Sequence, residues 1–171
     1  MKLSKQIMKP QDVVVLLKII ATDNQDWLQV TLAQSLKMSQ SEISQAVARA
    51  RYSGLMDENG KDVMRQSFMD FLQYGLSVVF PARPGAMVRG MPTAHSVSPL
   101  NQMIESSEIY VWPWAKGETR GQGIAPLYGT LPEAVLNDSK FYELIALVDT
   151  LRIGRVRERN LAIEILKERI C

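Results

Sequence analysis

Residues 40–49 hold a group of hydrogen-bonding side chains at helical spacing. It combines amide, hydroxyl and guanidinium groups from Gln40, Ser41, Ser44, Gln45 and Arg49. A glutamine amide can pair with the edge of adenine and an arginine with guanine, while short hydroxyl groups suit phosphates or close base edges. Apolar residues recur at 43, 47 and 50 with helical spacing. We therefore expect a helix whose polar side chains point away from the core.

A second set of cations occupies the middle of the chain. Its members are candidate contacts for a phosphate or another anionic ligand: Arg83, Arg89, Lys116 and Arg120. They stand among glycines and prolines, which are typical of chain reversals. The glycines match neither the P-loop pattern nor the dinucleotide-binding pattern. An exposed loop without a ligand is the alternative that we favour for this segment.

Residues suited to catalysis or metal binding are scarce. His95 is the only histidine and Cys171 the only cysteine. A catalytic triad or a histidine–cysteine metal cluster needs partners that the sequence does not supply. We therefore expect no enzyme activity, no metal and no cofactor, and we interpret His95 as a structural residue. Trp27, Trp112 and Trp114 can stack on bases or on a ligand, but burial is the commoner fate of such residues.

The composition is that of an ordinary globular protein. The chain has 171 residues, of which 46% are hydrophobic and 22% charged, and its net charge is +2. A uniformly basic nucleic-acid coat is excluded, although a local basic surface is not. The apolar run of residues 13–20 is too short to cross a membrane, and residues 1–6 do not resemble the start of a signal peptide. We expect a cytoplasmic protein without membrane contact.

The elements that must position residues 40–49 follow from local signals. Apolar periodicity predicts a buried helix behind Pro10 and a shorter helix over residues 31–37. Ser39 and Glu42 have the spacing of a capping box, which predicts the start of a helix at residue 40. Gly54 is a natural stop for that helix. Asn59-Gly60 predicts a hairpin turn, because both residue types tolerate positive φ.

This order of elements is that of a winged helix-turn-helix. The stretch from residue 32 to residue 55 reads LAQSLKMSQSEISQAVARARYSGL. Its Leu-Ala pair, short spacer, Ser, Ile-Ser, apolar stripe and Gly-Leu ending resemble the bacterial winged helix-turn-helix regulators, broadly of the multiple-antibiotic-resistance-regulator (MarR-like) type. The resemblance covers about residues 10–65 and no more of the chain.

The resemblance implies a role for each matching residue. Gln40, Ser41, Ser44, Gln45 and Arg49 occupy positions that face the major groove of DNA in that family. Residues 59–61 would form the tip of the wing, where Lys61 is expected to meet a phosphate. Ala48 departs from the pattern, because many relatives carry a basic residue there. This departure predicts weaker DNA binding or more reliance on neighbouring elements.

The rest of the chain mixes helices with short strands. The sequence predicts a helix over residues 66–74, strands over 76–80 and 108–114, and a turn-rich loop over 116–123. Helical periodicity returns after residue 131, with a short helix there, a second helix that begins at Ser139 and is broken at Gly154, and a third helix over residues 156–170. Their apolar stripes suit either a homodimer interface or packing onto the middle of the same chain. We thus expect a mainly α fold with small β elements, as a winged domain (residues 1–65) and an α+β partner, ligand or dimerisation region (residues 66–171).

The sequence is consistent with two functions. The first is a homodimeric transcription regulator that reads double-stranded DNA with the helix at residues 40–53. For this function, replacing Arg49 with alanine should weaken specific binding by about 1–3 kcal/mol. The alternative is a winged-helix module that binds a protein partner, as an antitoxin-like or complex-assembly subunit, without sequence-specific DNA binding.

Overall fold

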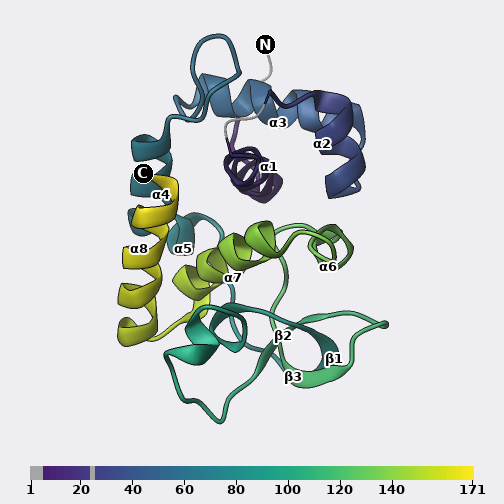
Figure 1. Ribbon diagram of the computed structural model, residues 1–171, viewed down its shortest axis with the longest axis vertical. Helices are drawn as coiled ribbons and strands as arrows, with labels where there is room; N and C mark the ends of the chain where they lie inside the picture. The colour runs from purple at the N-terminus through teal and green to yellow at the C-terminus, as the bar shows by residue number, and fades with distance from the viewer. Residues whose placement is uncertain (1–5, 24–25) are drawn as a thin grey trace.

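The computed structural model describes residues 6–23 and 26–171, and within them a small three-stranded sheet lies at one end of a group of helices (Figure 1). The predicted class, mainly α with small β elements, is confirmed. The helices are α1 (Pro10–Ala21), α2 (Gln29–Leu36), α3 (Gln40–Tyr52), α4 (Arg65–Tyr74), α5 (Leu76–Val79), α6 (Leu131–Ala134), α7 (Ser139–Ile153) and α8 (Val156–Ile170). The strands are β1 (Met87–Pro92), β2 (Tyr110–Pro113) and β3 (Thr119–Gly123). Residues 1–5, on which the prediction of localisation partly rests, lie outside the described residues.

Helix α1 lies at the centre of the upper half of the molecule in Figure 1. It is packed between α3 on one side and α7 on the other, which explains why all residues from Asp12 to Leu17 are buried. Pro10 begins the helix at a position that needs no backbone donor. The Asp12 carboxylate accepts a hydrogen bond from the backbone N–H of Lys9 at 2.9 Å, which stabilises the first turn.

The turn between α2 and α3 is short and well defined. Lys37 has a left-handed conformation with φ of 55°, and the next amide, that of Met38, donates to the carbonyl of Ala33 at 3.0 Å. The Ser39 hydroxyl then accepts from the Glu42 amide at 3.1 Å and begins α3, as the sequence predicts. The other half of the predicted capping box is replaced, because the Glu42 carboxylate accepts from the side chain of Gln11 on α1.

Helix α3 ends at the predicted glycine and leads into the hairpin. Gly54 has φ of +79°, and the amides of Gly54 and Leu55 donate to Arg51 and Ala50 respectively, which is the Schellman pattern. Met56 and Val63 pair across the hairpin. Gly60 has positive φ whereas Asn59 does not, so the predicted two-residue Asn-Gly turn is wrong. The loop is longer, and the Asp57 carboxylate closes it by accepting from the amides of Lys61 and Asp62.

Two predictions about the middle of the chain are wrong. Residues 76–80 do not form a strand, because α5 occupies this segment and packs on α7. The amides of Val79 and Phe80 donate to carbonyls four residues earlier, and Val78 and Val79 are exposed. Residues 116–123 are not only a loop, because β3 forms within them.

The three strands close into a very small barrel. Strand β1 is antiparallel to both β2 and β3, and β2 runs parallel to β3. At two glycines the backbone segments of the barrel come too close together for a side chain. A Cβ atom on Gly90 would lie 1.9 Å from the carbonyl oxygen of Trp112, and one on Gly117 would lie 2.3 Å from that of Gly90. Glycine at these two positions therefore lets the strands approach closely enough to close.

A buried polar network fastens the barrel to α7. The Asp149 carboxylate accepts from the Trp112 indole at 2.7 Å and from the Thr93 hydroxyl at 2.6 Å. Its second oxygen accepts from the guanidinium of Arg152 at 2.9 Å. Asp149, Thr93 and Trp112 are completely buried, so the network satisfies groups that would otherwise be costly to desolvate.

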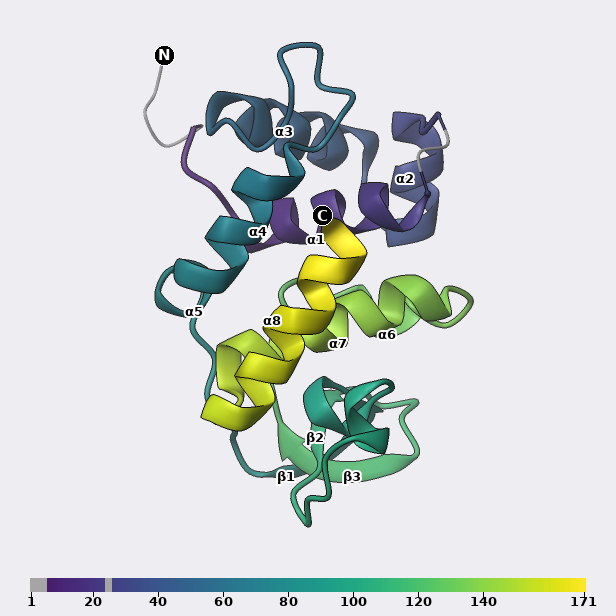
Figure 2. The same ribbon diagram turned by 60° about the vertical axis from the view of Figure 1, so that its left-hand side comes forward.

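The last helix completes the same core. Ala162, Leu166 and Ile170 on α8 are buried, and α8 packs on α7 and α4 (Figure 2). The apolar stripe of α8 is thus covered within one chain, as in the intramolecular alternative. Among the helices formed by residues 6–23 and 26–171, none combines the length and the apolar character needed to span a bilayer.

Candidate nucleic-acid interface

The outer face of α3 is exposed at one end of the molecule, far from the barrel (Figures 1 and 2). Ile43, Ala46, Val47 and Ala50 are buried on its inner face. Four of the five polar residues predicted from this helix are exposed as expected: Gln40, Ser41, Ser44 and Gln45. The Gln45 amide donates to the Ser41 hydroxyl at 3.0 Å, which connects two successive turns of this face.

Arg49 is the exception, and its predicted outward orientation is wrong. Only 4% of the residue is exposed, and its guanidinium holds the Asp12 carboxylate of α1 in a bidentate arrangement. The Nη2–Oδ1 distance is 2.7 Å and the Nε–Oδ2 distance 2.9 Å. The hydrogen bonds from Arg49 to Asp12 raise the pKa of Arg49 above its ordinary value. Arg49 is therefore unavailable to bind a base edge.

The position of Arg49 explains the error. Residue 49 lies at the flank of the helix, between the apolar stripe and the exposed face, because successive residues are about 100° apart. From there a long side chain can turn either way. The missed signal was Asp12, a carboxylate in the first turn of a helix that is apolar on almost every side. A buried carboxylate needs a cation or several donors close by.

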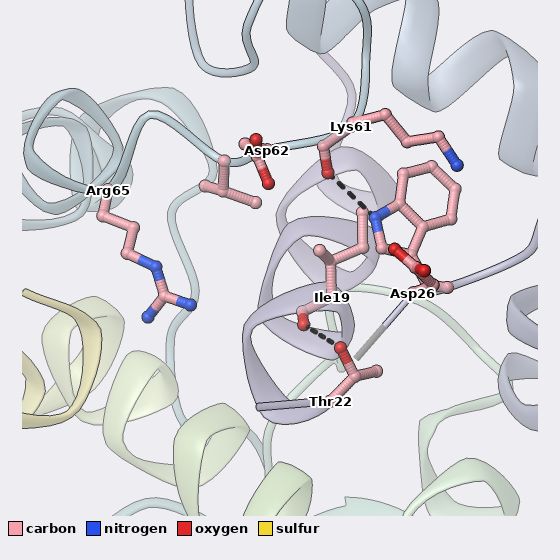
Figure 3. A pocket seen from close by; sticks show the side chains of 8 residues that line it. Ile19, Thr22, Asp26, Lys61, Asp62 and Arg65 are labelled. Carbon is pink, nitrogen blue, oxygen red and sulfur yellow. Dashed lines mark hydrogen bonds between the residues drawn. The ribbon is translucent and has the colours of Figure 1, made fainter. Parts of the chain in front are cut away.

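The Lys61 side chain extends from the hairpin toward Trp27, which lies just before α2. Its ammonium group lies 5.3 Å from the centre of the Trp27 ring, and its backbone carbonyl accepts from the Trp27 indole at 2.9 Å. Figure 3 shows Lys61 and Arg65 on opposite sides of the adjoining pocket. This pocket has a volume of about 110 Å³ and is lined by Ile19, Thr22, Asp26, Trp27, Lys61, Asp62, Val63 and Arg65. The cation–π contact holds Lys61 near the protein surface in this conformation.

The C-terminal part of the exposed face of α3 contacts the hairpin. A shallow depression there is lined by Ala48, Arg51, Tyr52, Glu58 and Asn59. The Arg51 guanidinium donates to the backbone carbonyl of Glu58. The Arg51 side chain also packs against Gly60, where an added Cβ atom would lie only 2.8 Å from the Cδ atom of Arg51. The hairpin is thus packed onto α3. Arg51 and Glu58 contribute opposite charges, so this surface is polar without being strongly basic.

The remaining predicted contacts lie elsewhere. Arg83, Arg89 and Arg120 are exposed around the barrel and do not meet α3. Arg89 and Arg120 are direct partners in the β1–β3 register. His95 is 4% exposed and lies edge-on against Tyr110. Its Nε2 atom hydrogen-bonds with the Glu108 carbonyl at 3.0 Å, whereas its buried Nδ1 atom has no hydrogen-bond partner among the described residues.

The described side chains include no group of three or more His, Cys, Asp or Glu placed to hold a metal ion. No protein-family model, curated protein or solved structure matches the chain.

Proposed function

We propose that the protein is a DNA-binding transcription regulator in which α2, α3 and the hairpin act as a winged helix-turn-helix. The observation that supports this most is the exposed face of α3, where Gln40, Ser41, Ser44 and Gln45 have free access to solvent. A helix presented in this way fits the major groove of B-DNA. The hairpin beside its C-terminal end would lie along the neighbouring phosphates.

Each side chain has a distinct role in this proposal. Gln40 and Gln45 supply the amides that can pair with adenine, and Gln45 would exchange its bond to Ser41 for a base. Ser41 and Ser44 are short donors suited to phosphates or close base edges. Lys61 would have to leave the Trp27 ring to reach a phosphate, so its contribution is to affinity and not to sequence choice.

The test begins with selection of bound duplexes from a randomised pool, followed by titration of the best duplex at several salt concentrations. We expect Gln45→Ala to weaken binding to the selected duplex by about 1–3 kcal/mol. Its affinity for random duplex should hardly change. Gln102→Ala is a matched control, because Gln102 is an exposed glutamine far from α3 on the chain. Absence of duplex binding at low salt would refute the proposal.

The burial of Arg49 favours a second candidate function. Without it, Arg51 is the remaining cation of α3, and Arg51 already donates to Glu58. Tyr52, 67% exposed, and Ala48 add apolar area beside the hairpin. This combination suits a protein partner, as in the antitoxin-like or complex-assembly alternative. The same titration separates the two functions, because phosphate neutralisation makes DNA affinity fall steeply with salt.

A homodimer remains part of the proposal. Two copies related by a two-fold axis would place two α3 helices on half-sites about 34 Å apart and would double the number of phosphate contacts. Because α8 is covered within the chain, the dimer would need another surface. Sedimentation equilibrium with and without the selected duplex measures this directly, and a single copy on a palindromic duplex would exclude it.

A further inference from the structure

The barrel carries two arginines of like charge directly opposite each other. Arg89 on β1 and Arg120 on β3 are partners in the antiparallel register. The pair formed by Ala86 and Gly123 is hydrogen-bonded, since the Gly123 amide donates to the Ala86 carbonyl at 3.0 Å. Hydrogen-bonded and non-hydrogen-bonded pairs alternate, so Arg89 and Arg120 occupy a non-hydrogen-bonded pair, where Cα atoms are only about 4.5 Å apart.

This arrangement is unfavourable for the protein alone. Like charges directly opposite on neighbouring strands destabilise a sheet. Both arginines are exposed, and none of the described residues forms an ion pair with either guanidinium. Arg155 shows the contrast, because its exposed guanidinium pairs with Glu108. A ligand with oxyanions would supply the neutralisation that the protein itself does not provide.

An aromatic side chain lies on the other side of Arg89. The Trp114 amide donates to the Arg89 carbonyl at 3.1 Å, which continues the β1–β2 register and places Trp114 across from Arg89. Trp114 is partly exposed, unlike the buried Trp112. Arg120, Arg89 and Trp114 therefore form a row across the outside of the barrel, which we call the outer row.

Neighbouring charges extend the basic character of this surface. Lys116 lies in the turn that follows Trp114, closed by a 3.0 Å hydrogen bond from the Gly117 amide to the Trp114 carbonyl. Arg83 lies just before the Gly85 amide, which donates to the Gly123 carbonyl on β3. Between residues 83 and 123 these four cations stand against three carboxylates, Glu105, Glu108 and Glu118. Glu108 is already paired with Arg155, so the cations of this segment remain in excess.

We propose that the outer row binds single-stranded nucleic acid, with Arg89 and Arg120 on backbone phosphates and Trp114 stacked on a base. Guanidinium groups bind phosphate oxygens in a bidentate manner, and an indole offers the face on which an unpaired base stacks. A duplex keeps its bases inside its own stack, so it could use the arginines but not Trp114. The outer row lies at the opposite end of the molecule from α3 (Figure 1) and acts independently of the proposed duplex site.

The test is a fluorescence-anisotropy titration of the full chain with a labelled oligothymidine at several salt concentrations. The double variant Arg89→Ala/Arg120→Ala should lower affinity at low salt and reduce the slope of log affinity against log salt by about 1.4, or about 0.7 per lost phosphate contact. Trp114→Ala should lower affinity roughly tenfold, with rescue by Trp114→Phe. Arg157→Ala removes an exposed arginine from α8 and is the matched control.

Arg120→Glu separates binding from folding. It replaces the like-charge pair with an opposite-charge pair, so we expect a higher melting temperature together with weaker oligothymidine binding. Gln45→Ala should leave oligothymidine binding unchanged, so failure of the α3 proposal is distinguishable from failure of this one. The proposal is overturned if the wild type does not bind oligothymidine at low salt, if the double variant binds like Arg157→Ala, or if Trp114→Ala binds like the wild type.

Discussion

The ion pair between Arg49 and Asp12 fixes how α3 lies on α1. The exposed fractions of the two side chains are 3% and 0%, so neither charge is stabilised by water. Removing one partner of such a pair destabilises the fold far more than replacing both partners with apolar residues, because it leaves a buried charge without a counter-charge. The sequence placed Arg49 on a helix correctly but did not show which way a flanking side chain would turn.

We predict that Arg49→Ala lowers the free energy of unfolding by about 3–5 kcal/mol, because it leaves the Asp12 carboxylate buried without a cation. Urea denaturation measures the change. The double variant Asp12→Ala/Arg49→Met should lose less than Arg49→Ala alone, since no uncompensated charge remains. A loss for Arg49→Ala no larger than that of the exposed Arg157→Ala would contradict the role given to the pair.

Tyr142 joins α7 to the end of β1, where its hydroxyl donates to the Pro92 carbonyl. Burial raises the pKa of Tyr142 to about 12, whereas an unfolded tyrosine has an ordinary value near 10. Between these two values the unfolded chain loses the proton while the folded protein keeps it. The stability contributed by the neutral phenol is therefore present below pH 10 and lost as the pH rises toward 12.

We predict that Tyr142→Phe reduces the fall in the free energy of unfolding between pH 9 and pH 11, because it removes this titration. Urea denaturation at the two pH values gives the difference for each protein. Tyr74→Phe is the control, since Tyr74 is 74% exposed on α4 and should behave like the wild type. Equal pH dependence in Tyr142→Phe and the wild type would contradict the prediction.

Among the elements, those with strong local signals were predictable. The helical periodicity after Pro10, the Ser39 cap and the Gly54 stop all mark ends that the structure has. The strand predicted over residues 76–80 is wrong because a short run of apolar and β-branched residues suits either a buried strand or a helical turn. Only packing on α7 decides between them. Strand β3 was missed because Thr119–Gly123 contains two glycines, which usually indicate a turn.

The turn before α3 contains a strained residue. Lys37 has φ of 55°, a conformation that is unfavourable for residues with a Cβ and open to glycine. We predict that Lys37→Gly raises the free energy of unfolding by about 0.5–1 kcal/mol. Thermal and urea denaturation measure the gain. Lys167→Gly, at an exposed helical position of α8, should have the opposite sign, and loss of stability in both variants would contradict this account.

At the scale of the whole molecule, one hydrophobic core crosses residue 65. Buried side chains from α1, α2 and α3 belong to the same cluster as those of α7 and α8. The division into residues 1–65 and 66–171 stays a prediction about function. Spacing along the chain gave no indication that α7 would lie beneath α1, because such contacts join residues more than a hundred positions apart.

We predict a single cooperative unfolding transition for the whole chain. Leu147 on α7 is completely buried, and Leu147→Ala should destabilise the molecule by about 2–5 kcal/mol. Hydrogen exchange should show the same loss of protection at the slowest amides of α1 and of β2. Protection of β2 that falls while that of α1 is retained would show that the two halves open separately.

The close approach of backbone at two glycines of the barrel limits how the sequence of this protein can vary. At Gly90 and Gly117 a Cβ atom would collide with neighbouring backbone, so we expect every amino-acid replacement at these two positions to be destabilising. Arg89 and Arg120 point outward and are free to change without disturbing the barrel. Natural variation in the barrel should therefore be confined to its exposed positions. Changes there can create or remove a ligand site while Gly90 and Gly117 stay glycine.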